Sequence, residues 1–81
     1  MNHTAPIKIM LVDDESLILF TLRQIIQQFS DMQVVCTAGS SEEALTLLQT
    51  YTPDLILLDI QMPYMNGITC LRHIYKYYPT I

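Results

Sequence analysis

Three aspartates, Asp13, Asp14 and Asp59, are the residues of this sequence best suited to chemistry. Asp13 and Asp14 directly follow the largely apolar run Ile7–Val12, and Asp59 directly follows the apolar run Leu55–Leu58. An aspartate has an ordinary pKa of about 3.9, so three of them brought together at neutral pH would repel one another. Mg2+ would relieve that repulsion, because it prefers one or two carboxylates together with phosphate oxygens. One carboxylate would then stay free to attack a phosphorus atom.

A purely structural interpretation of these aspartates is also open. Asp13 and Asp14 could cap the helix that follows them, and Asp59 could begin a turn. Capping accounts well for any single aspartate, but it does not explain two acids after one strand and a third after another. Glu15 is different, because an acid in the first turn of a helix accounts for it. We therefore expect a functional site that contains the three aspartates and leaves Glu15 out.

The elements that must position these aspartates can be predicted from apolar patterns. Ile7–Val12, interrupted only by Lys8, and Leu55–Leu58 are typical of strands buried on both faces of a parallel sheet. A shorter strand is predicted over residues 33–37, a β-branched stretch that precedes the turn residue Gly39. The two longer runs end directly at the aspartates, so they are expected to hold them.

A helix is predicted after each strand. The first ends near Ser30, the second begins at the capping box formed by Ser40 and Glu43 and ends before Pro53, and the third ends before Pro79. The apolar positions expected to face the core are Ile18, Leu22, Ile25, Ile26 and Phe29 in the first helix, Ala44, Leu47, Leu48 and Tyr51 in the second, and Ile68, Leu71, Tyr75 and Tyr78 in the third.

The alternation of strands and helices predicts an α/β fold with a flavodoxin-like parallel sheet and helices on both faces. Residues 1–6 would form a tail and residues 7–81 three strand–helix units, with Thr80 and Ile81 approaching a fourth strand, so we expect a truncated domain. If the strands are ordered 2-1-3, Asp13, Asp14 and Asp59 meet at the carboxyl ends of neighbouring strands. Ligands bind at that edge of such sheets.

These segments resemble the receiver domains of bacterial two-component response regulators, and the similarity extends from Ile7 to Ile81. It lies in the paired acids of the segment 10–15, Met-Leu-Val-Asp-Asp-Glu, and in the segment 54–67, Asp-Leu-Ile-Leu-Leu-Asp-Ile-Gln-Met-Pro-Tyr-Met-Asn-Gly. The resemblance implies a phosphoacceptor module of a phosphorelay, which takes the phosphoryl group autocatalytically and is not a metabolic enzyme.

The resemblance also implies a role for each site residue. Asp59 would accept a phosphoryl group from a sensor histidine kinase, while Asp13, Asp14 and Asp59 hold Mg2+ together with the backbone carbonyl of Gln61. The Gln61 side chain would face the phosphoryl group and influence its hydrolysis. A full receiver also has a Ser or Thr after strand four and a Lys after strand five, and neither falls within these 81 residues. Phosphoryl transfer depends on such positioned charges.

Composition restricts the partners of this stretch. The formal net charge is −4, and the basic residues are scattered as Lys8, Arg23, Arg72 and Lys76. A surface for a phosphate backbone needs clustered cations, so DNA is expected only through a transcriptional output domain outside this stretch. Cys36 and Cys70 lack metal-ligand spacing and are expected to be free buried thiols. No membrane span or targeting segment is recognisable, which favours a cytoplasmic protein.

Two other functions stay open. The chain could be a receiver-like assembly module that binds a partner without phosphorylation, although the complete set of aspartates argues against it. It could also be a phosphatase of the haloacid-dehalogenase type, but that family has a second Asp two residues after the nucleophile, where Gln61 stands. Separately, Leu55–Leu58 contains no charge, Pro or Gly, so an uncovered edge of this strand would favour self-association.

Overall fold

The computed structural model describes residues 5–61 and 67–81. The elements, in chain order, are β1 (Ile7–Val12), α1 (Ser16–Ile26), β2 (Met32–Ala38), α2 (Ser41–Leu47), β3 (Leu55–Leu58) and α3 (Gly67–Tyr77). Every predicted strand and helix is therefore present. The resemblance to receiver domains also implies that Met62-Pro63 and Asn66-Gly67 shape the loop that leads into the third helix. Of these residues, Met62, Pro63 and Asn66 lie outside the described residues.

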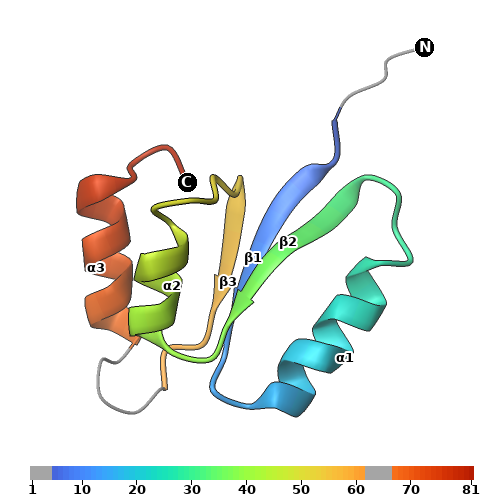
Figure 1. Cartoon of the computed structure of the whole chain (residues 1–81), viewed down its shortest axis with the longest axis horizontal. Coiled ribbons are helices and arrows are strands. Elements are labelled where there is room, and N and C mark those ends of the chain that lie inside the picture. Colours follow the sequence, from blue (N-terminus) through green and yellow to red (C-terminus); the bar gives the residue numbers. More distant parts are fainter. Residues whose placement is uncertain (1–4, 62–66) are drawn as a thin grey trace.

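The sheet is parallel and has the strand order β2-β1-β3, as predicted. Helix α1 covers one face, and α2 and α3 lie together on the other (Figure 1). Side chains of β1 pack against the helices on both faces of the sheet, because successive side chains point to opposite faces of a strand. Ile9 and Leu11 pack towards α1, whereas Met10 and Val12 pack towards α2 and α3. This two-sided burial explains why β1 is almost continuously apolar.

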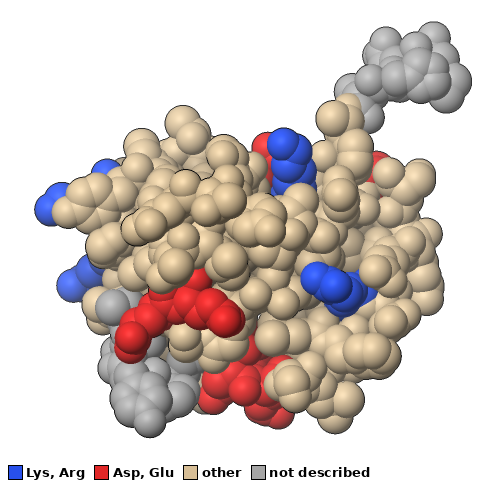
Figure 2. All heavy atoms as spheres, viewed as in Figure 1, with Lys and Arg blue, Asp and Glu red and all other residues tan. Residues whose placement is uncertain are grey.

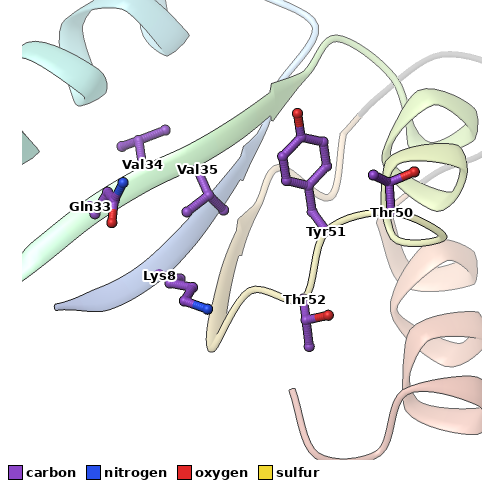
Figure 3. A pocket seen from close by; sticks show the side chains of 7 residues that line it. All are labelled: Lys8, Gln33, Val34, Val35, Thr50, Tyr51 and Thr52. Carbon is purple, nitrogen blue, oxygen red and sulfur yellow. The ribbon is translucent and has the colours of Figure 1, made fainter. Parts of the chain in front are cut away.

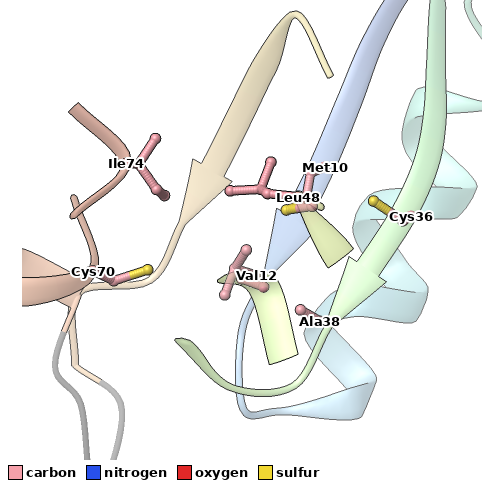
Figure 4. Close-up of a cluster of buried hydrophobic side chains, with 8 residues drawn as sticks. Met10, Val12, Cys36, Ala38, Leu48, Cys70 and Ile74 are labelled. Atoms are coloured by element: carbon pink, nitrogen blue, oxygen red, sulfur yellow. The ribbon is translucent and has the colours of Figure 1, made fainter. Parts of the chain in front are cut away.

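The larger core cluster lies between the sheet and the pair α2 and α3 (Figure 4). Its members are all less than about a tenth exposed, and they are Met10, Val12, Cys36, Ala38, Ala44, Leu48, Cys70 and Ile74. Both cysteines are buried here as free thiols, which agrees with the prediction. The cluster anchors α3 to the same strands that end at the aspartates.

Helix α3 buries a different face from the one predicted. Gly67, Cys70 and Ile74 are its buried residues, whereas Leu71 and Tyr75 are 52% and 76% exposed. Ile68 is also exposed, and of the predicted set only Tyr78 packs against the core. The small Gly67 lies against the main chain of Asp59 and Ile60, and the small Cys70 packs in the larger core cluster. Apolar residues on adjacent stripes of one helix do not reveal which stripe faces inward.

Helix α1 shows the same kind of difference. Ile26 is buried and Leu22 is half-buried, as expected, but Ile18, Ile25 and Phe29 are exposed. Leu19, which was not predicted to face inward, packs on the core instead. The helix also ends earlier than Ser30. After Ile26 the backbone tightens into turns in which Gln28 and Phe29 donate to the carbonyl groups three residues back.

The capping box before α2 is present, but the Glu43 side chain bonds Gly39, the residue before the N-cap Ser40. The N–H of Glu43 donates to Ser40 Oγ at 3.0 Å, while Glu43 Oε1 accepts from the N–H of Gly39 at 2.6 Å. Ala44 and Leu48 then face the core as predicted, with Leu47 half-buried against it. Tyr51 lies beyond the helix and is exposed, so its assignment to the helical face was wrong.

Candidate metal centre

The carboxyl ends of all three strands are joined by main-chain hydrogen bonds at the edge where the aspartates lie. The N–H of Asp59 donates to the carbonyl oxygen of Val12 at 2.9 Å, and the N–H of Asp13 donates to the carbonyl oxygen of Ala38 at 3.0 Å. These bonds extend the sheet pairing by one residue beyond β1 and β3. Asp13 and Asp59 are therefore held side by side by the backbone.

The structure brings the three predicted aspartates together. One carboxylate oxygen from each of Asp13, Asp14 and Asp59 lies within 4.8 Å of the other two. Mg2+ binds oxygen at about 2.0–2.1 Å, so oxygens on opposite sides of one ion are separated by roughly 4 Å. The upper limit of 4.8 Å in the cluster is of the same order. The donor set, three hard oxygens at a partly solvated edge, suits Mg2+, which keeps several water ligands.

Two of the three carboxylates are oriented by the main chain. Asp13 Oδ1 accepts a hydrogen bond from the N–H of Glu15 at 2.9 Å, and Asp59 Oδ1 accepts one from the N–H of Gln61 at 3.0 Å. Each bond closes a short turn in which the aspartate contacts the backbone two residues later. The second oxygen, Oδ2, of both residues accepts no hydrogen bond within the described parts of the chain. It is available to a cation or to phosphorus.

The helix that follows β1 does not use these acids as caps. Glu15 occupies the N-cap position of α1 and makes no side-chain capping bond, and the first turn of α1 contains no acid. The expectation that Glu15 is a first-turn acid was therefore wrong by one position. The Asp13 carboxylate accepts a hydrogen bond from the N–H of Glu15, which lies before the first residue of the helix. The capping interpretation of Asp13 thus loses its main support.

The surface around the cluster is acidic. Figure 2 shows red atoms gathered along the lower edge of the face in view, with no blue atoms among them. Asp13 and Asp59 are half-buried and Asp14 is exposed. Like charges at this spacing repel, and partial burial lessens the screening by water. A bound cation would therefore stabilise this edge.

Two hollows lie at opposite ends of the strands. One of about 340 Å³ adjoins the cluster and is lined by Val12, Asp13, Leu19, Leu22, Leu57, Leu58 and Asp59. A larger one of about 510 Å³ is lined by Lys8, Gln33, Val34, Val35, Thr50, Tyr51 and Thr52 (Figure 3). The larger hollow has no acid in its lining and lies beside the start of β1. We place the site at the smaller hollow, because only that one contains the aspartates.

The family of the chain follows from a comparison of its sequence with known families. Residues 9–81 match the model of the response regulator receiver domain. The chain belongs to this family. The match includes every aspartate of the cluster and all three strands from Ile9 onward. The resemblance noted in the sequence is thereby confirmed for the fold and for the family.

Curated proteins similar to this receiver differ in their overall activity. The chain is 41% identical over 73 residues to protein-glutamate methylesterase/protein-glutamine glutaminase 2 of Oleidesulfovibrio alaskensis, covering 90% of this chain and 20% of that protein. It is 38% identical over 71 residues to the nitrate/nitrite response regulator protein NarL of Escherichia coli K12, covering 88% of this chain and 33% of that protein. The receiver thus spans a fifth to a third of these relatives.

Solved structures agree with the fold. The response regulator domain of Thermotoga maritima CheB superposes with a TM-score of 0.87 at 39% identity, over 93% of this chain and 56% of that one. A chain of the CheX-CheY-BeF3-Mg2+ complex from Borrelia burgdorferi gives a TM-score of 0.84 at 32% identity, over 93% of this chain and 57% of that one. RcsB of Salmonella typhimurium, at 23% identity and a TM-score of 0.88 over 96% of this chain and 40% of that one, shares the fold.

Gln61 and Gly67 both lie beside Asp59. Gln61 is exposed, and its N–H contacts Asp59 Oδ1, so the metal-binding role of its carbonyl group stays a prediction. Gly67 was expected only to shape a loop, but it is the first residue of α3 and packs on the main chain of Asp59 and Ile60. A glycine between a strand end and a helix was the available signal.

None of the described helices combines the length and the apolar character that a membrane span requires.

Proposed function

We propose that Asp59 is the phosphoacceptor of a two-component phosphorelay and takes its phosphoryl group from a sensor histidine kinase in the cytoplasm. Asp13, Asp14, Asp59 and the backbone carbonyl of Gln61 would hold Mg2+. The observation that supports this best is the approach of three carboxylates from two distant segments to within 4.8 Å, in a member of the receiver family. The same edge is where ligands bind in open α/β sheets.

The hydrogen bonding favours Oδ2 of Asp59 as the nucleophile, because Oδ1 already accepts from the N–H of Gln61. An electron pair on Oδ2 attacks phosphorus, the P–N bond of the phosphohistidine breaks, and an acyl phosphate forms while the nitrogen keeps the bonding pair. When bound, Mg2+ would neutralise charge on the phosphoryl oxygens. The Gln61 side chain, exposed beside the acceptor, would influence how fast water hydrolyses the product.

The output of the signal belongs to sequence outside this receiver. We propose transcriptional control through an attached DNA-binding domain, for which the response regulator RcsB, solved in complex with DNA, is a precedent. Control of a methylesterase is the second candidate, because a protein-glutamate methylesterase is 41% identical to this chain over 73 residues. In either case the receiver acts as a switch, and its own stretch has too few cations for DNA.

Labelling by a small phosphodonor tests the acceptor. In a protein that contains this receiver, acetyl phosphate with Mg2+ should label the wild type, and Asp59→Asn should abolish the label without unfolding the domain. Asp54→Asn is the matched control, because Asp54 Oδ2 accepts from the N–H of Lys8 at the far end of β3. Labelling that persists in Asp59→Asn would place the acceptor elsewhere.

Beryllofluoride separates a phosphoacceptor from an assembly module. It mimics a phosphoryl group, so a working acceptor should respond to beryllofluoride only when Mg2+ is present. The wild type should show this metal-dependent change in its NMR spectrum, and Asp59→Asn should not. A wild type that ignores both reagents yet still binds a partner would favour the module without phosphorylation.

A further inference from the structure

Gly67 lies unusually close to the main chain that carries the acceptor. A Cβ atom built on Gly67 would overlap the Cα of Ile60, and it would stand 2.6 Å from the carbonyl oxygen of Asp59 and 3.0 Å from the Cβ of Ile60. The N–H of Gly67 also donates to the carbonyl oxygen of Ile60 at 3.0 Å. The closest contacts are with backbone, which cannot rotate away as a flexible side chain could.

Both sides of this contact are anchored in the fold, α3 by core packing and the strand end by one main-chain hydrogen bond. On one side, α3 is held on the sheet by Cys70 and Ile74, which are 0% and 4% exposed. On the other side, Asp59 is bonded to the end of β1 through its N–H. Gly67, the first residue of α3, does not adopt the left-handed backbone conformation that favours glycine. Only the lack of space excludes a side chain at this position. The strain of a larger residue must therefore fall on Asp59 and Ile60.

The displaced segment is the turn that orients the acceptor. Ile60 lies inside the turn closed by the hydrogen bond from the N–H of Gln61 to Asp59 Oδ1. A shift of Ile60 would lengthen this bond and let the Asp59 carboxylate rotate away from Asp13 and Asp14. Misplacement of a reacting group by about 1 Å can cost about a hundredfold in rate. The position of α3 and the direction of the carboxylate are thus linked through Gly67.

We propose that Gly67 is a positioning residue for Asp59: its missing side chain lets the start of α3 close on the Asp59–Ile60 backbone and aims the carboxylate into the acidic cluster. This inference rests on the proposed metal and phosphoacceptor role of that cluster. It adds that a residue of α3, remote in sequence from Asp13, sets the affinity of the cluster for a cation.

Mg2+ affinity tests the proposal, with a second glycine as the matched control. Gly39 also lies at this edge of the sheet, but a Cβ there would meet only Glu43 Oε1 at 3.9 Å. Titration calorimetry with Mg2+ alone should give a Kd for Gly67→Ala raised about tenfold or more. Gly39→Ala should keep the wild-type Kd. Ile74→Val, a core change in α3 that leaves the contact intact, should lower Tm while keeping the Kd.

The outcomes separate this inference from the proposed function. Wild type that binds Mg2+, with Asp59→Asn that does not, supports the site; Gly67→Ala with the wild-type Kd would then overturn only the positioning role. Wild type without Mg2+ binding would overturn both. If Gly67→Ala does not fold, an NMR titration of the wild type with Mg2+ tests the proposal instead. The amide signals of Gly67 and Gln61 should then shift with one common midpoint. A Gly67 amide signal that does not shift would overturn the proposal.

Discussion

The N–H of Asp59 donates a hydrogen bond of 2.9 Å to the carbonyl oxygen of Val12, the residue that precedes Asp13. This bond continues the parallel pairing of β1 with β3 and keeps the two aspartates side by side, although they are far apart in the sequence. It also means that the distance between them is set by sheet geometry and not by side-chain attraction. The fold therefore imposes the repulsion between the carboxylates, and a bound cation would relieve it.

Because of this repulsion, we expect the effect of Asp59→Asn on Tm to depend on whether Mg2+ is present. Without metal, Asp59→Asn should raise Tm, because it removes one of three clustered charges, a gain on the order of 1 kcal/mol or less for partly exposed groups. With Mg2+, the wild type should gain stability and the variant should gain much less. Thermal unfolding in chelator and in Mg2+ measures both. Equal metal responses would mean that no shared cation site exists.

The capping contact of α2 predicts a specific loss of stability. Ser40→Ala removes the acceptor for the N–H of Glu43 and should cost about 1 kcal/mol of the free energy of unfolding. Ser30→Ala, an exposed position just after α1, should stay within about 0.5 kcal/mol of the wild type. Urea denaturation followed by circular dichroism compares the two. A Ser40→Ala variant as stable as Ser30→Ala would show that the cap contributes nothing.

The outer edge of β3 predicts self-association of the 81-residue chain. No described strand pairs with that edge, and Leu55 and Leu57 are 44% and 40% exposed there. Light scattering across a concentration series should show growth of oligomers, and Leu57→Lys should suppress it, because a charge on an edge strand opposes pairing. Leu17→Lys, at a 71% exposed position in α1, should not. A strictly monomeric wild type would contradict this prediction.

The buried thiols predict a pH-dependent stability. Burial raises the pKa of Cys36, and burial raises that of Cys70 despite a hydrogen bond with Ser41 that lowers it. In the unfolded chain the thiols titrate near the ordinary value of about 8.5. Stability is thus unaffected below that pH and falls as the pH rises from there towards the raised pKa of the folded state.

Two measurements check the thiols. Iodoacetamide slightly above neutral pH should alkylate Cys36 and Cys70 slowly in the native protein and quickly in urea, because only the thiolate reacts. The fall of Tm with rising pH should be smaller in Cys70→Ala, which lacks one of the two groups. Fast alkylation of the native protein would show that these thiols are accessible and that their burial is transient.

Much of this protein follows from local sequence. The strands were predictable because a parallel strand buried on both faces must be apolar at nearly every position, as Leu55–Leu58 is. The start of α2 was predictable because Ser40 and Glu43 have the spacing of a cap. Asp13, Asp14 and Asp59 were identifiable because each follows a strand, and parallel strands end at one edge of the sheet.

Tertiary packing decided what local patterns left open. Apolar residues occupy more than one stripe of α1 and α3, so the sequence alone did not show which stripe faces inward. In α3 the small Gly67 and Cys70 are buried, whereas the larger Leu71 and Tyr75 are exposed. The contact between Gly67 and Asp59 joins the start of α3 to the end of β3, and no periodicity in the sequence encodes such a distance. Close packing of backbone on backbone is a property of the assembled layers, and it brings Gly67 against the main chain of Asp59 and Ile60.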